Sequence, residues 1–204
     1  MRIITISREF GSGGRELGKR MADELGFAYY DREIITAIAQ KKGLDENYVE
    51  HALDSSAAPQ FTFTFRHSFA MPHVIQSPQT DLLLEQKKVI DSIAAAGRDC
   101  IIVGRNADVL LRDYKPMSIF VCAAQEAKVT RCIERTEDGE NITEDEIIRN
   151  MRRIDKNRAR TREILSGSKW GDPAAYDLVI NTTGWNIKKL APAVAEFAKS
   201  WFAK

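Results

Sequence analysis

The chain has 204 residues, of which 44% are hydrophobic and 29% are charged, a composition typical of one globular domain with a substantial core. The 30 basic and 29 acidic residues give a net charge of +1, which argues against general attraction to nucleic acid or to membrane surfaces. The sequence also has no apolar run that approaches the roughly 18 residues of a membrane-spanning helix.

The three cysteines have no metal-ligand spacing, and we expect them to be free thiols, with Cys100 and Cys122 buried in apolar runs. Free thiols are typical of a reducing cytoplasm. The apolar start, residues 1–6, is too short for the core of a signal peptide. These features predict a cytoplasmic protein.

The chain begins with a β-branched run, residues 3–6, which predicts a buried strand. A glycine-rich turn follows, and residues 15–25 then have helical spacing. A strand, a glycine turn and a helix form the layout of a phosphate cradle, because glycines let backbone N–H groups approach an anion at the positive end of the helix. The alternative is a purely structural turn.

The turn departs from the orthodox P-loop, G-x-x-x-x-G-K-[ST], whose lysine binds the β- and γ-phosphates. With Gly13 as the second glycine, Arg8 stands at the first glycine, Gly14 at the lysine and Arg15 at the hydroxyl residue. The backbone donors survive, at Gly11, Ser12, Gly13 and Gly14. Arginine can bind phosphate bidentately, so Arg8 and Arg15 keep an anion site the favoured interpretation.

Residues 27–30 predict a second strand and residues 32–42 a helix, for which Asp31 is a candidate N-cap. Residues 46–53 predict a short helix. Farther along, Phe61, Phe63 and Phe65 alternate with polar residues, which suggests an exposed strand or hairpin arm. The stretch 44–80 is therefore an insertion packed on its own domain, a dimer contact or a lid, and the sequence leaves these alternatives open.

Three further strands are predicted from short apolar runs, over 99–103, 117–123 and 176–181. Helices are predicted between and after them, over 82–96, 107–111, 125–135, 143–165 and 187–202. Alternating strands and helices predict an α/β fold, a parallel sheet sandwiched by helices.

Several helix details follow from capping and spacing. Thr80 and Asp81 are candidate caps for the helix over 82–96, and Thr143 with Glu146 forms a capping box for the helix over 143–165. In the last helix, four residues are predicted to share one side: Leu190, Val194, Phe197 and Trp201.

Ligands of parallel sheets bind beyond the carboxyl ends of the strands. The glycine turn, Asp31 and Gly104–Arg105 all fall at such ends. The helix over 149–162 adds seven basic residues with one acid, which form either a solvated face or a phosphate-clamping lid. The absence of interleaved aromatic residues argues against an RNA-binding patch.

In order and spacing, these motifs resemble the cytidylate kinase-like family, a branch of the P-loop nucleoside monophosphate kinases. Residues 3–31 resemble the start of a bacterial cytidylate kinase, and 100–105 resemble its strand that ends in Gly-Arg-Asp, with Asn106 in place of the Asp. Residues 155–159 are similar to the Asp-Arg-Asn-Arg-Ala of the lid, and 176–182 to the last strand.

The resemblance implies one P-loop kinase-like domain over 1–204, with an acceptor-side insertion at 44–80 and a lid-like helical segment at 136–170. It implies transfer of the γ-phosphate of ATP, with Mg²⁺, to a nucleotide or other small phosphorylated acceptor, first of all CMP. It implies no nucleic-acid or membrane partner and no metal ligand among the site residues. A homodimer through 44–80 is a further expectation.

Site residues carry over by position. The donor phosphates would be held by Arg8, Gly11, Ser12, Gly13, Gly14 and Arg15. The acceptor would be bound by Asp31, Arg32 and Arg105, and the transferred group would be handled by Arg15, Asp155 and Arg158.

Two departures from the family pattern matter. The P-loop lysine is missing, so Arg8 or Arg15 would have to supply its charge. The family's acceptor-side Asp-Ser, followed by an Arg, becomes Asp31-Arg32, with Ala37 where that Arg is expected. The alternative function is therefore a non-catalytic nucleotide- or phosphate-binding protein that kept the kinase fold.

Overall fold

The computed structural model describes residues 1–54, 78–135 and 143–204. Within them, five parallel strands form one sheet: β1 (Ile3–Arg8), β2 (Ala28–Tyr30), β3 (Cys100–Val103), β4 (Met117–Cys122) and β5 (Leu178–Asn181). Their order in the sheet is β2-β3-β1-β4-β5. The predicted α/β class and the parallel sheet are confirmed.

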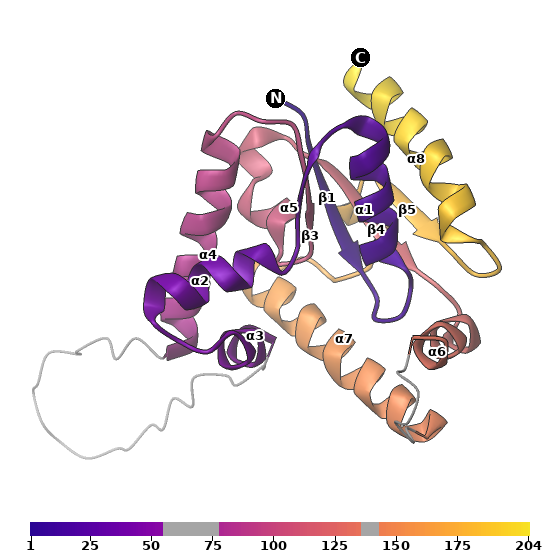
Figure 1. Ribbon diagram of the computed structural model, residues 1–204, viewed down its shortest axis with the longest axis horizontal. Helices are drawn as coiled ribbons and strands as arrows, with labels where there is room; N and C mark the ends of the chain where they lie inside the picture. The colour runs from indigo at the N-terminus through magenta and orange to yellow at the C-terminus, as the bar shows by residue number, and fades with distance from the viewer. Residues whose placement is uncertain (55–77, 136–142) are drawn as a thin grey trace, which may run out of the picture.

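Helices cover both faces of this sheet (Figure 1). One core cluster joins the sheet to α1 (Gly14–Leu25) and α8 (Ile187–Phe202). The second cluster joins the other face to α2 (Glu33–Lys42), α3 (Glu46–Asp54), α4 (Pro78–Ala95) and α5 (Ala107–Leu110). Because β-branched strand residues such as Ile4 and Ile102 are fully buried, each contributes about 1.5–3 kcal/mol of hydrophobic stabilisation.

Two more helices lie at the carboxyl edge of the sheet, α6 (Gln125–Ile133) and α7 (Glu144–Ser166). In Figure 1, α7 crosses below the carboxyl ends of the strands. The predicted capping box is present, since the Thr143 hydroxyl accepts from Glu146 N–H and the Glu146 carboxylate accepts from Thr143 N–H. Short 3-10 turns occupy Arg112–Tyr114 and Pro173–Ala175.

Three details differ from the sequence predictions. Helix α4 begins at Pro78, so Thr80 and Asp81 lie inside its first turn and do not cap it. Asp81 instead accepts a hydrogen bond from Lys42 Nζ at 2.8 Å. Phe197 is 43% exposed, because α8 packs closely on α1 through a buried face of mostly small residues: Ile187, Ala191, Val194, Ala195 and Ala198.

All three cysteines are free, with Cys100 buried and Cys122 half-buried. The predicted Phe61–Phe65 arm lies outside the described residues. None of the helices in the described part of the chain is long and apolar enough to cross a membrane.

Candidate functional site

The order of the strands explains why three sequence motifs meet. Strands β2, β3 and β1 are neighbours, so Asp31 after β2, Gly104–Arg105 after β3 and the glycine turn after β1 leave the same edge of the sheet. The turn reverses direction with left-handed backbone at Gly11 (φ 76°) and Gly13 (φ 83°), which glycine adopts without penalty. Helix α1 begins at Gly14, and its first N–H groups lack intrahelical partners.

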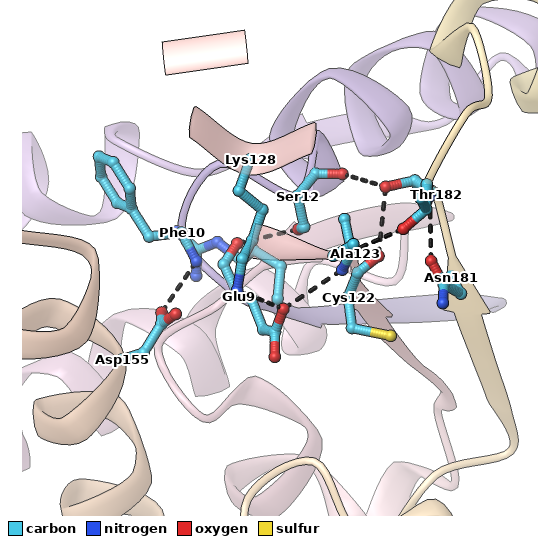
Figure 2. Close-up of polar contacts among 12 residues, drawn as sticks. Glu9, Phe10, Ser12, Cys122, Ala123, Lys128, Asp155, Asn181 and Thr182 are labelled. Atoms are coloured by element: carbon cyan, nitrogen blue, oxygen red, sulfur yellow. Dashed lines mark hydrogen bonds and ion pairs between the residues drawn. The ribbon is translucent and has the colours of Figure 1, made fainter. Parts of the chain in front are cut away.

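Ser12 holds the loop together from inside. It is fully buried, and its hydroxyl donates to the Glu9 carbonyl at 2.9 Å. The Ser12 carbonyl accepts from the Thr182 hydroxyl at 2.7 Å (Figure 2), and Arg131 donates to the same carbonyl and to that of Thr182. The Ser12 side chain therefore shapes the cradle and is turned away from its mouth.

Glu9 anchors the other side of the loop. Its carboxylate accepts from Lys128 Nζ at 2.9 Å and from the Ala123 N–H at 3.2 Å, as Figure 2 shows. The sequence reasoning missed both Lys128 and Arg131. A signal was available, because both lie in α6, the helix that follows the strand next to β1.

Helix α7 contacts the loop through two of the predicted site residues. The Asp155 carboxylate accepts from the Phe10 N–H at 2.8 Å and from Arg158 Nη1 at 3.1 Å. The same Arg158 nitrogen donates to the Arg8 carbonyl at 3.0 Å. Burial raises the pKa of Asp155 above its usual 3.8, against the opposing effect of Arg158.

The prediction that Asp31 caps α2 is wrong. The N-cap is Arg32, which makes no side-chain cap, and the Asp31 carboxylate points into the site. It forms ion pairs with Arg15 and, at 3.6 Å, with Arg8. Asp31 is only 3% exposed, and two arginines offset the cost of burying its charge.

The third strand end carries backbone strain. Gly104, Arg105 and Asn106 have φ values of 73°, 57° and 50°, and left-handed backbone costs a non-glycine residue on the order of 1 kcal/mol. Gln86 Nε2 supports the turn by donating to the Arg105 carbonyl at 3.0 Å. Such strain persists only where the surrounding structure holds the backbone in place, and it often occurs at functional sites, which makes Arg105 a candidate site residue.

Two cavities open on these residues. The first has a volume of about 420 Å³, and its described lining residues include six arginines and no acid; the arginines are Arg8, Arg15, Arg32, Arg105, Arg153 and Arg158. The second has a volume of about 790 Å³, is lined by the glycine turn, α6 and α7, and includes Glu9 and Glu146. The cavities share five lining residues: Arg8, Phe10, Arg15, Arg153 and Arg158.

This arrangement brings together every predicted site residue except Ser12, whose side chain faces inward. Asp31 does not line the two cavities, but it contacts Arg8 and Arg15, which line both. Trp170 lines the first cavity and packs edge-on against Phe120, with ring centroids 5.1 Å apart. Sequence reasoning missed Trp170, because nothing in its local pattern marks it.

The site fits polyanions better than it fits a metal held by protein ligands. Among residues 1–54, 78–135 and 143–204, no group of three or more His, Cys, Asp or Glu side chains is placed to bind a metal ion. Arg15 occupies the place where the orthodox motif has the hydroxyl that binds Mg²⁺. The second cavity, by contrast, combines several arginines with the N-terminus of α1, an arrangement that suits phosphate groups.

Comparison with protein families gives one decisive match, because the model of the cytidylate kinase-like family matches residues 3–184. The chain belongs to the cytidylate kinase-like family. No curated protein matches it. Family membership, with the described fold, supports a phosphotransferase of the P-loop kinase type.

Solved structures similar to this family member share its fold. An uncharacterized protein from Eubacterium ventriosum ATCC 27560 is 23% identical with a TM-score of 0.71, covering 98% of this chain and 99% of its own. Shikimate kinase from Bacteroides thetaiotaomicron is 12% identical with a TM-score of 0.57, covering 97% and 98%. Shikimate kinase from Acinetobacter baumannii in complex with shikimate is 13% identical with a TM-score of 0.52, covering 100% and 96%.

Proposed function

We propose that this protein transfers the γ-phosphate of ATP to a small phosphorylated acceptor, with CMP as the first candidate. The observation that carries the proposal is the meeting of two positively lined cavities at Arg8, Arg15, Arg153 and Arg158. Phosphoryl transfer needs positive groups around the moving phosphoryl, because catalysis depends on positioning and on electrostatic stabilisation.

The donor nucleotide is assigned to the second cavity, against the glycine turn and the start of α1. The acceptor is assigned to the first cavity, where Arg32 and Arg105 bind its phosphate. Phe10 and Trp170 add aromatic surface, and Asn47, Gln86 and Asn157 add amides. That combination suits a nucleoside monophosphate, whose base offers both a π-face and hydrogen-bonding edges.

The chemical step needs no general base from the protein, because the attacking phosphate oxygen is already deprotonated. An oxygen of the acceptor's phosphate attacks the γ-phosphorus, and the bond from that phosphorus to the β–γ bridging oxygen breaks. The bridging oxygen keeps the electron pair and leaves as part of ADP. Mg²⁺, which proteins commonly hold through few carboxylates and the substrate phosphates, neutralises negative charge on the nucleotide.

In this proposal α7 is the core of the lid over 136–170, and Asp155 and Arg158 position it against the glycine turn. The segment 44–80 is the acceptor-side insertion, to which α3 contributes Asn47 and Leu53 at the first cavity. A homodimer through 44–80 and a cytoplasmic location remain predictions.

The test is a panel of nucleoside monophosphates with ATP and Mg²⁺. We expect CMP to give the highest turnover, and Arg15→Ala to lower it on the order of 100-fold by removing a cation shared by both cavities. Lys19→Ala is the matched control in α1, because Lys19 is exposed and pairs with Asp23. It should leave turnover unchanged.

Two outcomes would contradict the proposal. If no monophosphate in the panel is phosphorylated, the assignment of the acceptor is wrong. ATP binding in calorimetry without any turnover would favour the alternative, a non-catalytic nucleotide-binding protein, which the missing lysine motivates.

A further inference from the structure

Arg8 and Gly14 compete for one volume in the glycine turn. A Cβ atom added to Gly14 would lie 2.6 Å from Arg8 Cβ, closer than real Cβ atoms approach other atoms, and 3.1 Å from Arg8 Cγ, a tight contact. The end of β1 and the start of α1 therefore leave room for a side chain at only one of these two positions.

The P-loop pattern places a glycine and a cation at the same two positions in the opposite order. In G-x-x-x-x-G-K-[ST] the first glycine falls at Arg8 and the lysine at Gly14. The glycine and the cation are thus exchanged in this chain, and the steric conflict explains why both positions differ together.

The exchange keeps a positive charge at the centre of the site. Arg8 lines both cavities, and its side chain is 11% exposed. Its guanidinium lies over Gly104, where a Cβ would overlap it. Two features therefore require glycine at position 104: the left-handed backbone, and the Arg8 side chain, which occupies the space that a Cβ atom would need.

The guanidinium donors of Arg8 remain available to a ligand. The Arg8 guanidinium forms an ion pair with Asp31 at 3.6 Å, and among the described residues it donates no hydrogen bond. A guanidinium carries five N–H donors, which can bind a phosphate through two parallel hydrogen bonds.

Nearby charges favour an anion at this point. Burial first, and then Arg158 beside it, lower the pKa of Arg8 to about 9, so the guanidinium is still charged at pH 7. Arg105 and Arg15 add to this repulsion. A bound phosphate would offset the repulsion among these arginines and accept hydrogen bonds from the Arg8 guanidinium.

We propose that Arg8 is the phosphoryl-binding cation of this site, taking the place of the P-loop lysine from the end of β1. Arg15 is less suited to the role, because its side chain is 54% exposed and forms the shorter of the two ion pairs with Asp31. The catalytic role of Arg8 rests on the proposed function. Its binding of a polyphosphate does not, and it can be measured in the absence of any kinase activity.

The first test removes the charge and keeps the volume. We expect Arg8→Met to fold, to lower CMP phosphorylation on the order of 100-fold and to abolish thermal stabilisation by inorganic tripolyphosphate. Arg112→Met is the matched control, since the Arg112 side chain is 78% exposed and lies outside both cavities. It should retain both properties.

The two proposals fail separately. If folded Arg8→Met keeps either property at the wild-type level, the assignment of Arg8 is wrong. If wild-type protein phosphorylates no acceptor, yet tripolyphosphate stabilises it and not Arg8→Met, the assignment of Arg8 holds while the proposed kinase activity does not.

The second test restores the orthodox order. We expect Arg8→Gly to lose activity, and Arg8→Gly with Gly14→Lys to recover at least about tenfold over it, because the lysine stem enters the vacated volume. Arg8→Gly with Gly14→Ala is the uncharged control and should stay inactive. Failure of the lysine variant to exceed the alanine variant would overturn the exchange.

Discussion

The Asp155 carboxylate is subject to two opposing effects, burial and hydrogen bonding. It accepts hydrogen bonds from the Phe10 N–H and from Arg158, and it is largely buried between α7 and the glycine turn. Burial favours its neutral form, whereas its hydrogen-bond partners favour the charged form, and the balance leaves its pKa raised. At neutral pH the charged carboxylate therefore carries a net cost.

This cost has a defined dependence on pH. A carboxyl group whose pKa is raised by folding destabilises the fold when ionised, and the penalty disappears as the pH falls through the raised pKa toward the ordinary value of 3.8. Asp155→Asn should therefore be at least as stable as wild type at pH 7. The difference in free energy of unfolding should shift in favour of wild type as the pH falls. Urea unfolding across this range measures it, and a difference that is constant with pH would contradict the assignment.

At the scale of elements, α7 is fixed at three places along its length. Near its start, Ile147 and Met151 pack with Val129 of α6. In the middle, Asp155 and Arg158 contact the glycine turn. Toward its end, Arg162 pairs with Asp108 of α5, and both side chains are about 95% buried.

Arg162 forms a structural ion pair with Asp108. From the sequence, Arg162 was predicted to belong to a solvated basic face or to a phosphate-clamping lid. Arg162 also lies 4.7 Å from the centre of the Tyr176 ring and donates to the Ser168 hydroxyl at 3.0 Å. It thereby ties α7 to the turn that begins at Gly104, since α5 starts directly after Asn106.

Removing this arginine should be costly. Arg162→Met leaves the Asp108 carboxylate buried without its partner, which typically destabilises a protein by about 3–5 kcal/mol. Arg160→Met, at an exposed position of the same helix, should change stability by less than about 0.5 kcal/mol. Urea unfolding compares the two. Equal stability of Arg162→Met and Arg160→Met would mean that the pair contributes nothing.

At the scale of the whole molecule, charge is unevenly distributed. The chain carries a net charge of only +1, yet the part of the first cavity that the structure describes is lined by six arginines and no acid. A positive cavity in a nearly neutral protein attracts small anions without attracting nucleic acid over the whole surface.

Added salt should therefore weaken acceptor binding more than it slows the chemical step. Between 50 and 500 mM KCl we expect the KM for CMP to rise on the order of tenfold through screening of the arginines, while kcat changes little. Steady-state kinetics at both salt concentrations provide the measurement. A KM that does not depend on salt would argue against electrostatic recognition of the acceptor.

Much of the fold was predictable because its signals are local. Buried runs such as residues 3–6 marked strands, and Thr143 with Glu146 fixed the start of α7. The wrong assignments concern contacts between distant segments. The sequence predicted Asp31 as a helix cap, but its carboxylate pairs with Arg8, which comes from the distant strand β1. The sequence predicted Phe197 on the buried side of α8, but α1 packs against the small residues of that helix instead.

The site was predictable in outline for a similar reason. Strand ends of a parallel sheet converge, so the glycine turn, Asp31 and Arg105 were expected together. The contacts of Lys128 and Arg131 with the loop could not be predicted from the sequence, because they depend on the packing of α6 against the loop. The shared volume of Arg8 and Gly14 also needed coordinates, since no sequence pattern reports a distance between side chains.

That shared volume also has an evolutionary meaning. A lineage that moves from the orthodox motif to this one must change the codons for Arg8 and Gly14, besides the codon for Arg15. A lysine-to-glycine change first removes the cation, and a glycine-to-arginine change first forces two side chains into the same space. If Arg8 is the phosphoryl-binding cation, we expect either single change to lower activity. On that proposal, the two forms of the loop are separated by intermediates of reduced fitness.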